Sequence, residues 1–243
     1  MNRGAEPLGT TGQLAAAYDA WYSQWAASDV DDALFPWQQA ALQVAADAFR
    51  GASVVDIGCG VGRLTRELVS RGARDAVGVD FSEAALCIAR QCTVEGLANA
   101  RFEWADAQSL PFSDKSFDVA FCCETIEHVL DPVAVLTEAR RVLVRGGVLI
   151  LTTPNYLGAL GIRRIGRRLR RRPYTEGGQP VNNLTTWPRT MWWLWRARFE
   201  LETVCLTGRT TRGERGEQVS SLVSPRLHPF RPLGVFRAVN RGG

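Results

Sequence analysis

The sequence lacks the long hydrophobic runs and the cysteine patterns that mark several large classes of protein. Among its 243 residues no apolar run approaches a membrane span, which needs roughly 18–20 residues. The first residues, MNRGAEPLGTTG, are polar and contain no apolar core of a signal peptide. None of the six cysteines belongs to a C-x-x-C pair or has a histidine partner at zinc-finger spacing. We therefore expect a cytoplasmic protein with reduced thiols and no structural zinc.

Histidine and lysine are scarce, and the basic charge is local. The chain has two histidines, His128 and His228, and a single lysine, Lys115. The formal net charge is +4, but seven arginines and no acid lie in residues 157–173. Subtracting those seven charges leaves the rest of the chain near −3. This distribution excludes a protein whose whole surface is basic, as expected of one that coats nucleic acid.

From residue 53 onward, short apolar segments alternate with helical ones. The sequence predicts strands at 53–57, 76–80, 100–106, 117–122 and 148–154. Helices are predicted over 62–71, 82–95 and 131–143, the last two beginning at capping residues. An aromatic-rich helix starting at residue 187 and two further strands at 199–206 and 233–240 follow. Strands alternating with helices of this length predict a parallel sheet with right-handed crossovers.

The most informative stretch is VVDIGCGVGRL, residues 54–64, where a buried strand runs into three glycines. Glycines at a strand-to-helix junction let a ligand approach the backbone closely. Dinucleotides and S-adenosylmethionine both use such a junction. In the dinucleotide fingerprint G-x-G-x-x-G the third glycine would fall at Arg63. Asp56 would also repel a pyrophosphate, whereas a carboxylate suits a sulfonium, so the stretch favours S-adenosylmethionine.

At this stretch the chain resembles the class I S-adenosylmethionine-dependent methyltransferases, whose signature of an acid followed by G-x-G-x-G is matched by DIGCGVG. The resemblance covers about residues 50–155. It implies that Asp80 accepts the ribose hydroxyls, Phe81 lies against the adenine, and Asp106 with Ala107 contacts the adenine edge. The end of the fourth strand would flank the methionine. The implied cofactor-binding residues are Asp56, Gly58, Cys59, Gly60, Gly62, Asp80, Phe81, Asp106, Ala107, Cys122 and Cys123.

The resemblance also implies the architecture. We expect an α/β fold, a Rossmann-like, doubly wound sheet of seven strands. An N-terminal helical cap (1–50) would precede the S-adenosylmethionine-binding half (51–154). A basic insert after the fifth strand (155–186) would lead to a C-terminal helix and closing strands of the same domain (187–243).

A second motif, E-x-x-E-H, follows the fourth strand. Glu124, Glu127 and His128 would share one face of a helical turn at the edge where open α/β sheets bind ligands. His128 is the candidate general base for an acceptor hydroxyl, with both glutamates as catalytic partners. Alternatively, the three side chains hold Mg²⁺.

The E-x-x-E-H stretch resembles the ubiquinone-biosynthesis O-methyltransferases (the methyltransferase type 11/12 group) and the small-RNA 2′-O-methyltransferases. Both groups use it for a divalent metal. The RNA enzymes add a histidine after the fifth strand, where this chain reads PVNNLT at 180–185. Because this chain has no histidine in that stretch, Mg²⁺ is possible as a cofactor but is not favoured.

The basic insert LGALGIRRIGRRLRRRP, residues 157–173, allows three interpretations. As an amphipathic helix it would touch the inner face of a membrane peripherally, as a lipid-contacting segment does in the ubiquinone-type enzymes. It could instead bind a phosphate-bearing acceptor, or be a solvated loop.

Aromatic side chains supply the last clue. Tyr18, Tyr22, Trp25 and Trp192 are candidates for the wall of an acceptor pocket, which would favour a flat or hydrophobic acceptor. The sequence thus predicts O-methylation of a hydrophobic small molecule, a lipid or a lipid-linked hydroxyl. The alternatives are an RNA 2′-O-methyltransferase and a non-catalytic S-adenosylmethionine-binding scaffold. The acceptor's identity and the oligomeric state stay open.

Overall fold

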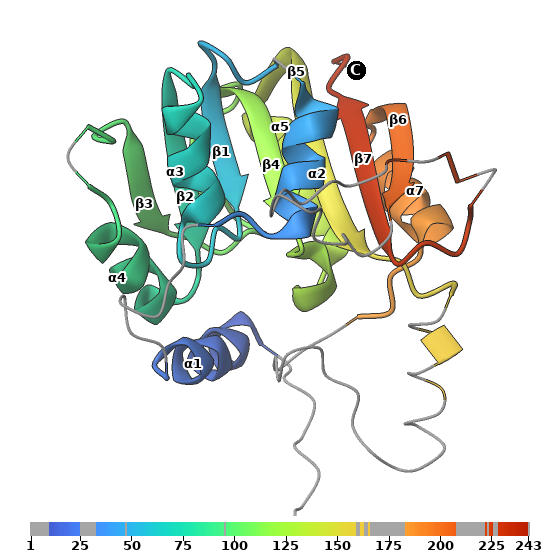
Figure 1. The fold of residues 1–243 in the computed structure, drawn as a ribbon, viewed down its shortest axis with the longest axis horizontal. Helices are drawn as coiled ribbons and strands as arrows, with labels where there is room; N and C mark the ends of the chain where they lie inside the picture. The colour runs from blue at the N-terminus through green and yellow to red at the C-terminus, as the bar shows by residue number, and fades with distance from the viewer. Residues whose placement is uncertain are drawn as a thin grey trace, which may run out of the picture.

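The computed structural model is a three-layer α/β structure built on one twisted sheet (Figure 1). It describes residues 10–24, 33–46, 48–94, 96–158, 161–162, 165, 183–207, 222, 224–225 and 228–242. The strands are β1 (Ser53–Ile57), β2 (Asp75–Asp80), β3 (Ala100–Trp104), β4 (Phe117–Cys123), β5 (Leu143–Pro154), β6 (Glu200–Thr207) and β7 (Leu233–Val239). The helices are α1 (Thr11–Tyr22), α2 (Pro36–Ala45), α3 (Arg63–Ser70), α4 (Glu83–Gln91), the 3₁₀ helix η2 (Ile126–His128), α5 (Pro132–Val142) and α7 (Trp187–Arg196).

The seven strands lie in the order β3-β2-β1-β4-β5-β7-β6. β1 to β5 are parallel, whereas β7 runs antiparallel to both β5 and β6. From β1 the chain moves outward to β2 and β3, and it then returns to place β4 on the other side of β1. The predicted Rossmann-like, seven-stranded fold is therefore confirmed.

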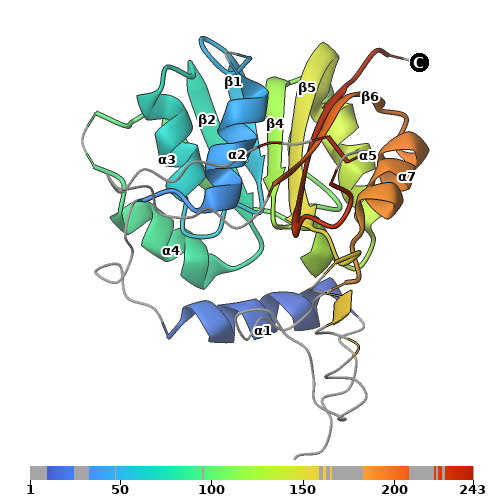
Figure 2. The same ribbon diagram turned by 45° about the vertical axis from the view of Figure 1, so that its right-hand side comes forward.

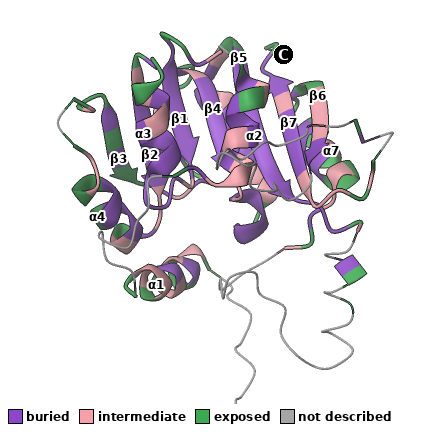
Figure 3. Cartoon of the chain, viewed as in Figure 1, coloured by how far each residue is buried: buried purple, intermediate pink, exposed green. Residues whose placement is uncertain are grey.

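Strand periodicity divides the core between the two faces of the sheet. Val55 and Ile57 belong to the cluster under α5 and α7, whereas Val54 belongs to the cluster under α2 and α3. Successive strand residues point to opposite faces, so the fully buried run of β1 supplies both cores (Figure 3). Asp56 faces the same side as Val54, toward α3.

The position of a ligand crevice follows from the strand order. Neighbouring strands whose connections lead in opposite directions leave space outside their carboxyl ends. In this sheet the two strands are β1 and β4, which pair through Val54–Val119 to Asp56–Phe121. The glycine loop follows β1 and the E-x-x-E-H motif follows β4, so the topology brings both motifs to one edge.

β5 differs from the sequence prediction at its start. The sequence predicted a helix up to residue 143 and a strand only from residue 148, but α5 ends at Val142 and β5 begins at Leu143. Phe117 pairs with Leu143, and the ladder resumes at Val119 with Val148. The extra residues form a bulge, and the positive φ of 83° at Gly146 accommodates it.

The two N-terminal helices have different positions. α2 packs on the sheet, with Ala41, Leu42 and Ala45 in the core beside α3. α1 instead lies outside the carboxyl ends of the parallel strands, apart from both helical layers (Figure 2). Only α1 therefore has the position of a cap. Most of the basic insert lies outside the described residues, and no helix in the described part is long and apolar enough to cross a membrane.

Candidate functional site

The glycine loop after β1 takes a backbone conformation that other residues rarely adopt. Gly58, Gly60 and Gly62 have φ angles of 74°, 53° and 77°. A Cβ on Gly58 would lie 2.3 Å from the Thr125 side chain, and one on Gly62 would lie 2.5 Å from Phe102. The three glycines therefore let the loop turn tightly beneath its neighbours, as the sequence indicated.

Replacing Gly58 should destabilise the folded protein and distort the glycine loop. We expect Gly58→Ala to lower the free energy of unfolding by about 2–4 kcal/mol, from left-handed strain plus the overlap with Thr125. Gly51→Ala is the matched control, because Gly51 has a φ of 68° but nothing within 4 Å of its Cβ position. Urea denaturation of both variants separates the two causes. An equal loss in both would show that the contact with Thr125 is unimportant.

Asp80, at the end of β2, holds the loop in place. Its Oδ2 accepts a hydrogen bond from the Gly60 amide at 2.9 Å, and its Oδ1 accepts one from the Ser82 amide at 2.9 Å. Burial raises the pKa of this carboxyl to about 6, against the lowering effect of the backbone donors at Ser82 and Gly60. Asp80 thus joins the glycine loop to the start of α4.

Asp56 lies behind the loop instead of in the pocket. It is 2% exposed and accepts a hydrogen bond from the Thr65 hydroxyl of α3 at 2.7 Å. Burial raises its pKa from 3.8 to about 7, partly offset by the Thr65 hydrogen bond. The sequence proposed a direct cofactor contact, but in this structure Asp56 supports the loop from the side of α3.

The raised pKa of Asp56 predicts a pH-dependent stability. A carboxyl with a raised folded-state pKa stabilises the fold below pH 4, and this contribution is lost as the pH rises toward 7. We therefore expect Asp56→Asn to be more stable than wild type, by about 1–3 kcal/mol more at pH 8 than at pH 5. Urea denaturation at both values measures this difference. Asp114→Asn, at an exposed acid, is the control, and a pH-independent gain in Asp56→Asn would contradict the prediction.

A small pocket of about 60 Å³ lies outside the carboxyl ends of β1, β2 and β4. Most of its walls come from the loops that follow the strands, and α1 closes one side. The lining residues are Tyr18, Tyr22, Gly58, Val79, Asp80, Phe81, Ala105, Ala107, Glu124, Thr125, His128 and Val129. The pocket thus brings together residues predicted for the cofactor, for the acceptor and for catalysis.

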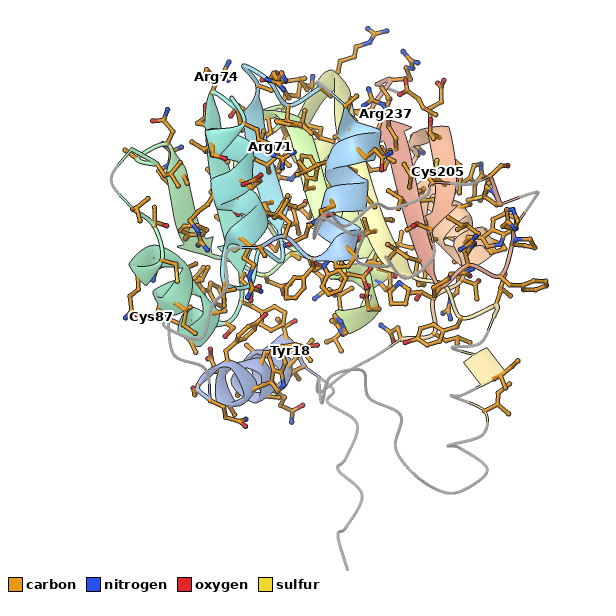
Figure 4. All side chains as sticks on the ribbon, in the orientation of Figure 1. Tyr18, Arg71, Arg74, Cys87, Cys205 and Arg237 are labelled. Atoms are coloured by element: carbon orange, nitrogen blue, oxygen red, sulfur yellow. The ribbon has the colours of Figure 1, made fainter. Side chains whose placement is uncertain are left out.

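Tyr18 forms the centre of the aromatic wall. It lies on the side of α1 that faces the sheet (Figure 4). Its ring contacts Phe81 edge-on at 5.4 Å between centroids and His128 at 5.9 Å. This arrangement places an apolar surface beside the imidazole, which suits a hydrophobic acceptor.

The E-x-x-E-H motif does not form the predicted helical face. Glu124 has a φ of 52°, so it ends β4 in a left-handed conformation and lies outside η2. Glu127 is 1% exposed and accepts a hydrogen bond from the Thr153 hydroxyl at 3.0 Å. His128 Nε2 lies 3.6 Å from Glu127 Oε1. Glu124 and His128 reach the pocket, and Glu127 lies behind His128.

This geometry does not present the three side chains as a metal site. Within the described part of the chain, no group of three histidine, cysteine or acidic side chains could hold a metal ion. One carboxylate oxygen of Glu127 is already bonded to Thr153.

Other predicted residues divide between the pocket and the core. Ala107 lines the pocket, but Asp106 instead accepts a hydrogen bond from the Gln108 amide at 2.9 Å. Cys59 packs against Leu86, Ala89 and Phe102. Cys122 is fully buried beneath α5 and α7, while Cys123 packs against the opposite core.

The remaining acceptor candidates are Trp25 and Trp192. Trp25 lies outside the described residues. Trp192 is 49% exposed on the outer surface of α7, where the Arg196 guanidinium stacks over its ring. Trp192, the tryptophan of α7 expected in the pocket wall, therefore lies on the surface, whereas Trp193 packs on the sheet.

The structure adds site residues that the sequence analysis missed. The Thr125 hydroxyl donates to the Ile57 carbonyl at 3.1 Å and so ties the end of β4 to the end of β1. Ala105 precedes the predicted adenine contacts by one residue and lines the pocket. Asp19 of α1 accepts hydrogen bonds from α4. Thr125 and Ala105 adjoin recognised motifs, which is a usable signal, whereas nothing local marks Asp19.

The central part of the chain matches a known protein family. Residues 55–151 match the family described as "Methyltransferase domain". The ubiquinone biosynthesis O-methyltransferase of Hahella chejuensis is 37% identical over 109 residues, which are 44% of this chain and 45% of the relative. The chain therefore matches less than half the length of this relative, and the family match over residues 55–151 includes the glycine loop and Asp80.

Solved structures show the same fold over almost the whole chain. A SAM-dependent methyltransferase from Thermotoga maritima superposes with a TM-score of 0.65, at 22% identity, covering 93% of this chain and 99% of that one. The [4+2]-cyclase SpnF has a TM-score of 0.67 at 18% identity, covering 99% of this chain and 100% of that one. At such identities the likeness shows the fold alone, and the residues of the site must decide the reaction.

Proposed function

Because the chain carries a methyltransferase domain, as the sequence predicted, we propose that it transfers a methyl group from S-adenosylmethionine to the hydroxyl oxygen of a hydrophobic small molecule. The observation that carries this proposal is a single pocket lined by Asp80, Tyr18 and His128. Asp80 suits the ribose of the cofactor, Tyr18 suits an apolar acceptor, and His128 is placed to take the proton.

The residues on the sheet side fit the cofactor. A loop of three left-handed glycines leaves backbone exposed to a ligand, and Asp80 offers a carboxylate at the end of the second strand. Phe81, Ala105 and Ala107 give an apolar surface for a purine. S-adenosylmethionine bound there supplies an electrophilic methyl carbon.

His128 is the group placed to handle the proton. The acceptor hydroxyl loses its proton as the oxygen–carbon bond forms, and an imidazole is suited to take it near neutral pH. Glu127, 3.6 Å behind the ring, favours the imidazolium that results. Tyr18 and the buried surroundings exclude water, so the remaining contribution is orientation of the two reactants.

The acceptor class follows from the wall of the pocket. The rings of Tyr18 and Phe81 meet edge-on at 5.4 Å, so an acceptor beside His128 faces apolar surface. The relative from Hahella chejuensis is named for ubiquinone biosynthesis and O-methylation, which supports a hydroxyl acceptor of this kind. Contact of residues 157–173 with a membrane or with RNA phosphates stays a prediction, because most of that segment lies outside the described residues.

The proposal is tested by transfer of a labelled methyl group from S-adenosylmethionine to a fractionated extract of the host cells. Label in the lipid-extractable fraction is the expected result. Label in RNA would favour the 2′-O-methyltransferase alternative. Binding of the cofactor without transfer to any fraction would contradict methyl transfer and favour the scaffold alternative.

A further inference from the structure

A groove of about 630 Å³ lies at the edge of the sheet where β4 and β5 begin. The segment before β4, the last turns of α5, the first residues of β5 and the segment after β7 surround it. This edge is opposite to α1, and the C-terminal end of the chain lies there (Figure 1). The described residues that line the groove all differ from those that line the pocket beside α1. The groove is therefore separate from the proposed methyl-transfer site, and its size is within the roughly 300–1,000 Å³ of ligand pockets.

The groove carries a positive charge. Four of its lining side chains are cationic and two are acidic, which gives a net charge of +2. These charged residues are Asp114, Lys115, Glu138, Arg140, Arg141 and Arg145. A concave surface of one sign concentrates ions of the opposite sign, so the groove favours an anion.

Both acids are already bound to one arginine. Arg141 donates to the two carboxylate oxygens of Glu138 at 2.8 Å each and to Asp114 at 2.8 Å. Its other hydrogen bonds go to the carbonyls of Phe112 and Leu110 at 2.7 and 2.9 Å. The hydrogen bond from Arg141 is the main cause that holds the pKa of Glu138 below its ordinary value. Arg141 and the two acids thus satisfy one another and leave the other three cations uncompensated.

Those three cations, Lys115, Arg140 and Arg145, have no acidic partner among the described residues. The Nε of Arg145 donates to the uncharged carbonyl of Arg241 at 3.1 Å. The Nε of Arg140 is buried and has no hydrogen-bond partner within the part of the chain that the structure describes. Orphaned donors of this kind are rare in native proteins and call for an explanation. An anion in the groove supplies one, because it offers the missing negative charge.

Capping of α5 does not explain the three cations. The Arg140 carbonyl in the last turn of this helix already accepts a hydrogen bond from Asn240 Nδ2 at 3.1 Å. The Val142 carbonyl accepts one from the Ser116 amide at 2.8 Å. A helix C-terminus also carries only about half a negative charge, which is small beside three full positive charges. The cations are therefore in excess of what the helix end needs.

We propose that the groove binds a small molecule that carries a diphosphate group, with Lys115, Arg140 and Arg145 contacting the phosphate oxygens. Arginine binds phosphate through two parallel N–H bonds, and lysine adds a compact charge. A phosphate monoester carries about 1.5–2 negative charges at neutral pH, so three unpaired cations suit two linked phosphates better than one. The remaining volume accommodates an organic group beside Thr137 and Leu143. This binding site goes beyond the proposed methyl transfer and does not depend on it.

Arg140→Gln and Arg145→Gln should each weaken the binding of inorganic pyrophosphate about tenfold, because each removes a charge-assisted contact. Lys115→Gln should weaken it less, about threefold, because a lysine makes no bidentate contact. Arg101→Gln is the matched control, since it removes the same charge from an exposed position of β3 outside the groove. This control should stay within about twofold of wild type. All four variants should bind S-adenosylhomocysteine as wild type does.

Calorimetry on the full chain at low ionic strength measures the binding of inorganic pyrophosphate, orthophosphate, uridine diphosphate and uridine. The probes lack adenine, so that they do not enter the proposed cofactor site. We expect both diphosphates to bind with dissociation constants below about 100 µM, orthophosphate to bind at least about tenfold more weakly, and uridine not to bind. Saturating S-adenosylhomocysteine should leave the binding of pyrophosphate unchanged. Far-UV circular dichroism and thermal unfolding confirm that each variant is folded.

The outcomes separate a specific site from general attraction of anions. Pyrophosphate binding that weakens in both arginine variants, and stays normal in Arg101→Gln, supports the inference. Equal weakening in Arg101→Gln, or no binding of pyrophosphate to wild type, overturns it. Competition by S-adenosylhomocysteine also overturns it, because the anion would then occupy the proposed cofactor site.

Two further results assign the failure to one proposal or the other. Tighter binding of an RNA oligonucleotide than of either diphosphate, weakened by the same arginine variants, would overturn the small-molecule site in favour of a nucleic-acid surface. Failure of the wild-type protein to bind S-adenosylhomocysteine would contradict the proposed function. Normal binding of pyrophosphate in that case would still support the groove as a diphosphate site.

Discussion

His128→Ala should lower the rate of methyl transfer by about 10²–10⁴-fold while leaving the affinity for S-adenosylhomocysteine within about threefold of wild type. The reason is the position of the imidazole. His128 lines the pocket beside Tyr18 and lies 3.6 Å from the carboxylate of Glu127, whereas the glycine loop and Asp80 lie on the sheet side. Loss of the imidazole therefore removes the proton acceptor and spares the cofactor contacts.

The chain offers a matched control for this variant. His228 is the other histidine of the sequence and lies outside the pocket, so His228→Ala should retain full activity. Because His128 is 9% exposed, His128→Asn is included to preserve packing, and it should be as inactive as the alanine variant. Transfer within about threefold of wild type in His128→Asn would show that His128 does not handle the proton.

Asp80→Ala should weaken S-adenosylmethionine binding by about 100-fold or more. A hydrogen bond to a charged group contributes about 1.5–3 kcal/mol, and a carboxylate that accepts two ribose hydroxyls would lose both. The variant also leaves the amides of Gly60 and Ser82 without their acceptor, so the loop itself loses its tie to β2. Calorimetry with S-adenosylhomocysteine measures the loss.

The pH dependence of binding gives an independent check on Asp80. Because burial raises its pKa to about 6, the carboxylate form predominates only above that pH. We expect the affinity of wild type to fall as the pH drops from 7 to 5, and the affinity of Asp80→Asn to change little over this range. Asp114→Ala, whose exposed side chain lies outside the pocket, should bind as wild type does. A wild-type affinity that is flat between pH 5 and 7 would argue against Asp80 as the ribose acceptor.

The central sheet could be predicted because its signals are local. β1 and β2 are short runs of β-branched and small residues, and Ser82 and Asp131 cap α4 and α5 through side-chain hydrogen bonds, as predicted. The glycine loop was predictable because three glycines at alternate positions meet a need that only glycine satisfies, a positive φ with no room for a Cβ.

The prediction that the E-x-x-E-H side chains share one helical face was wrong because the segment is not helical throughout. Spacing of three and four residues indicates a shared face only if the segment is helical throughout. The chain must first leave β4, and it does so at Glu124 with a φ of 52°, before a single 3₁₀ turn begins at Ile126. The resulting rotation separates Glu124 from Glu127, which is buried against Thr153 of β5.

By itself, the sequence determined the order of strands and helices, the glycine loop and the acid at the end of β2, because each depends on neighbours a few residues away. Only the tertiary structure decided which of these residues meet. It brought Thr125 to Gly58, turned Asp56 toward Thr65, left Trp192 on the surface and placed Tyr22 against Gly60. Those contacts join parts of the chain separated by up to 67 positions, and they depend on sheet order and helix packing, which no local pattern encodes.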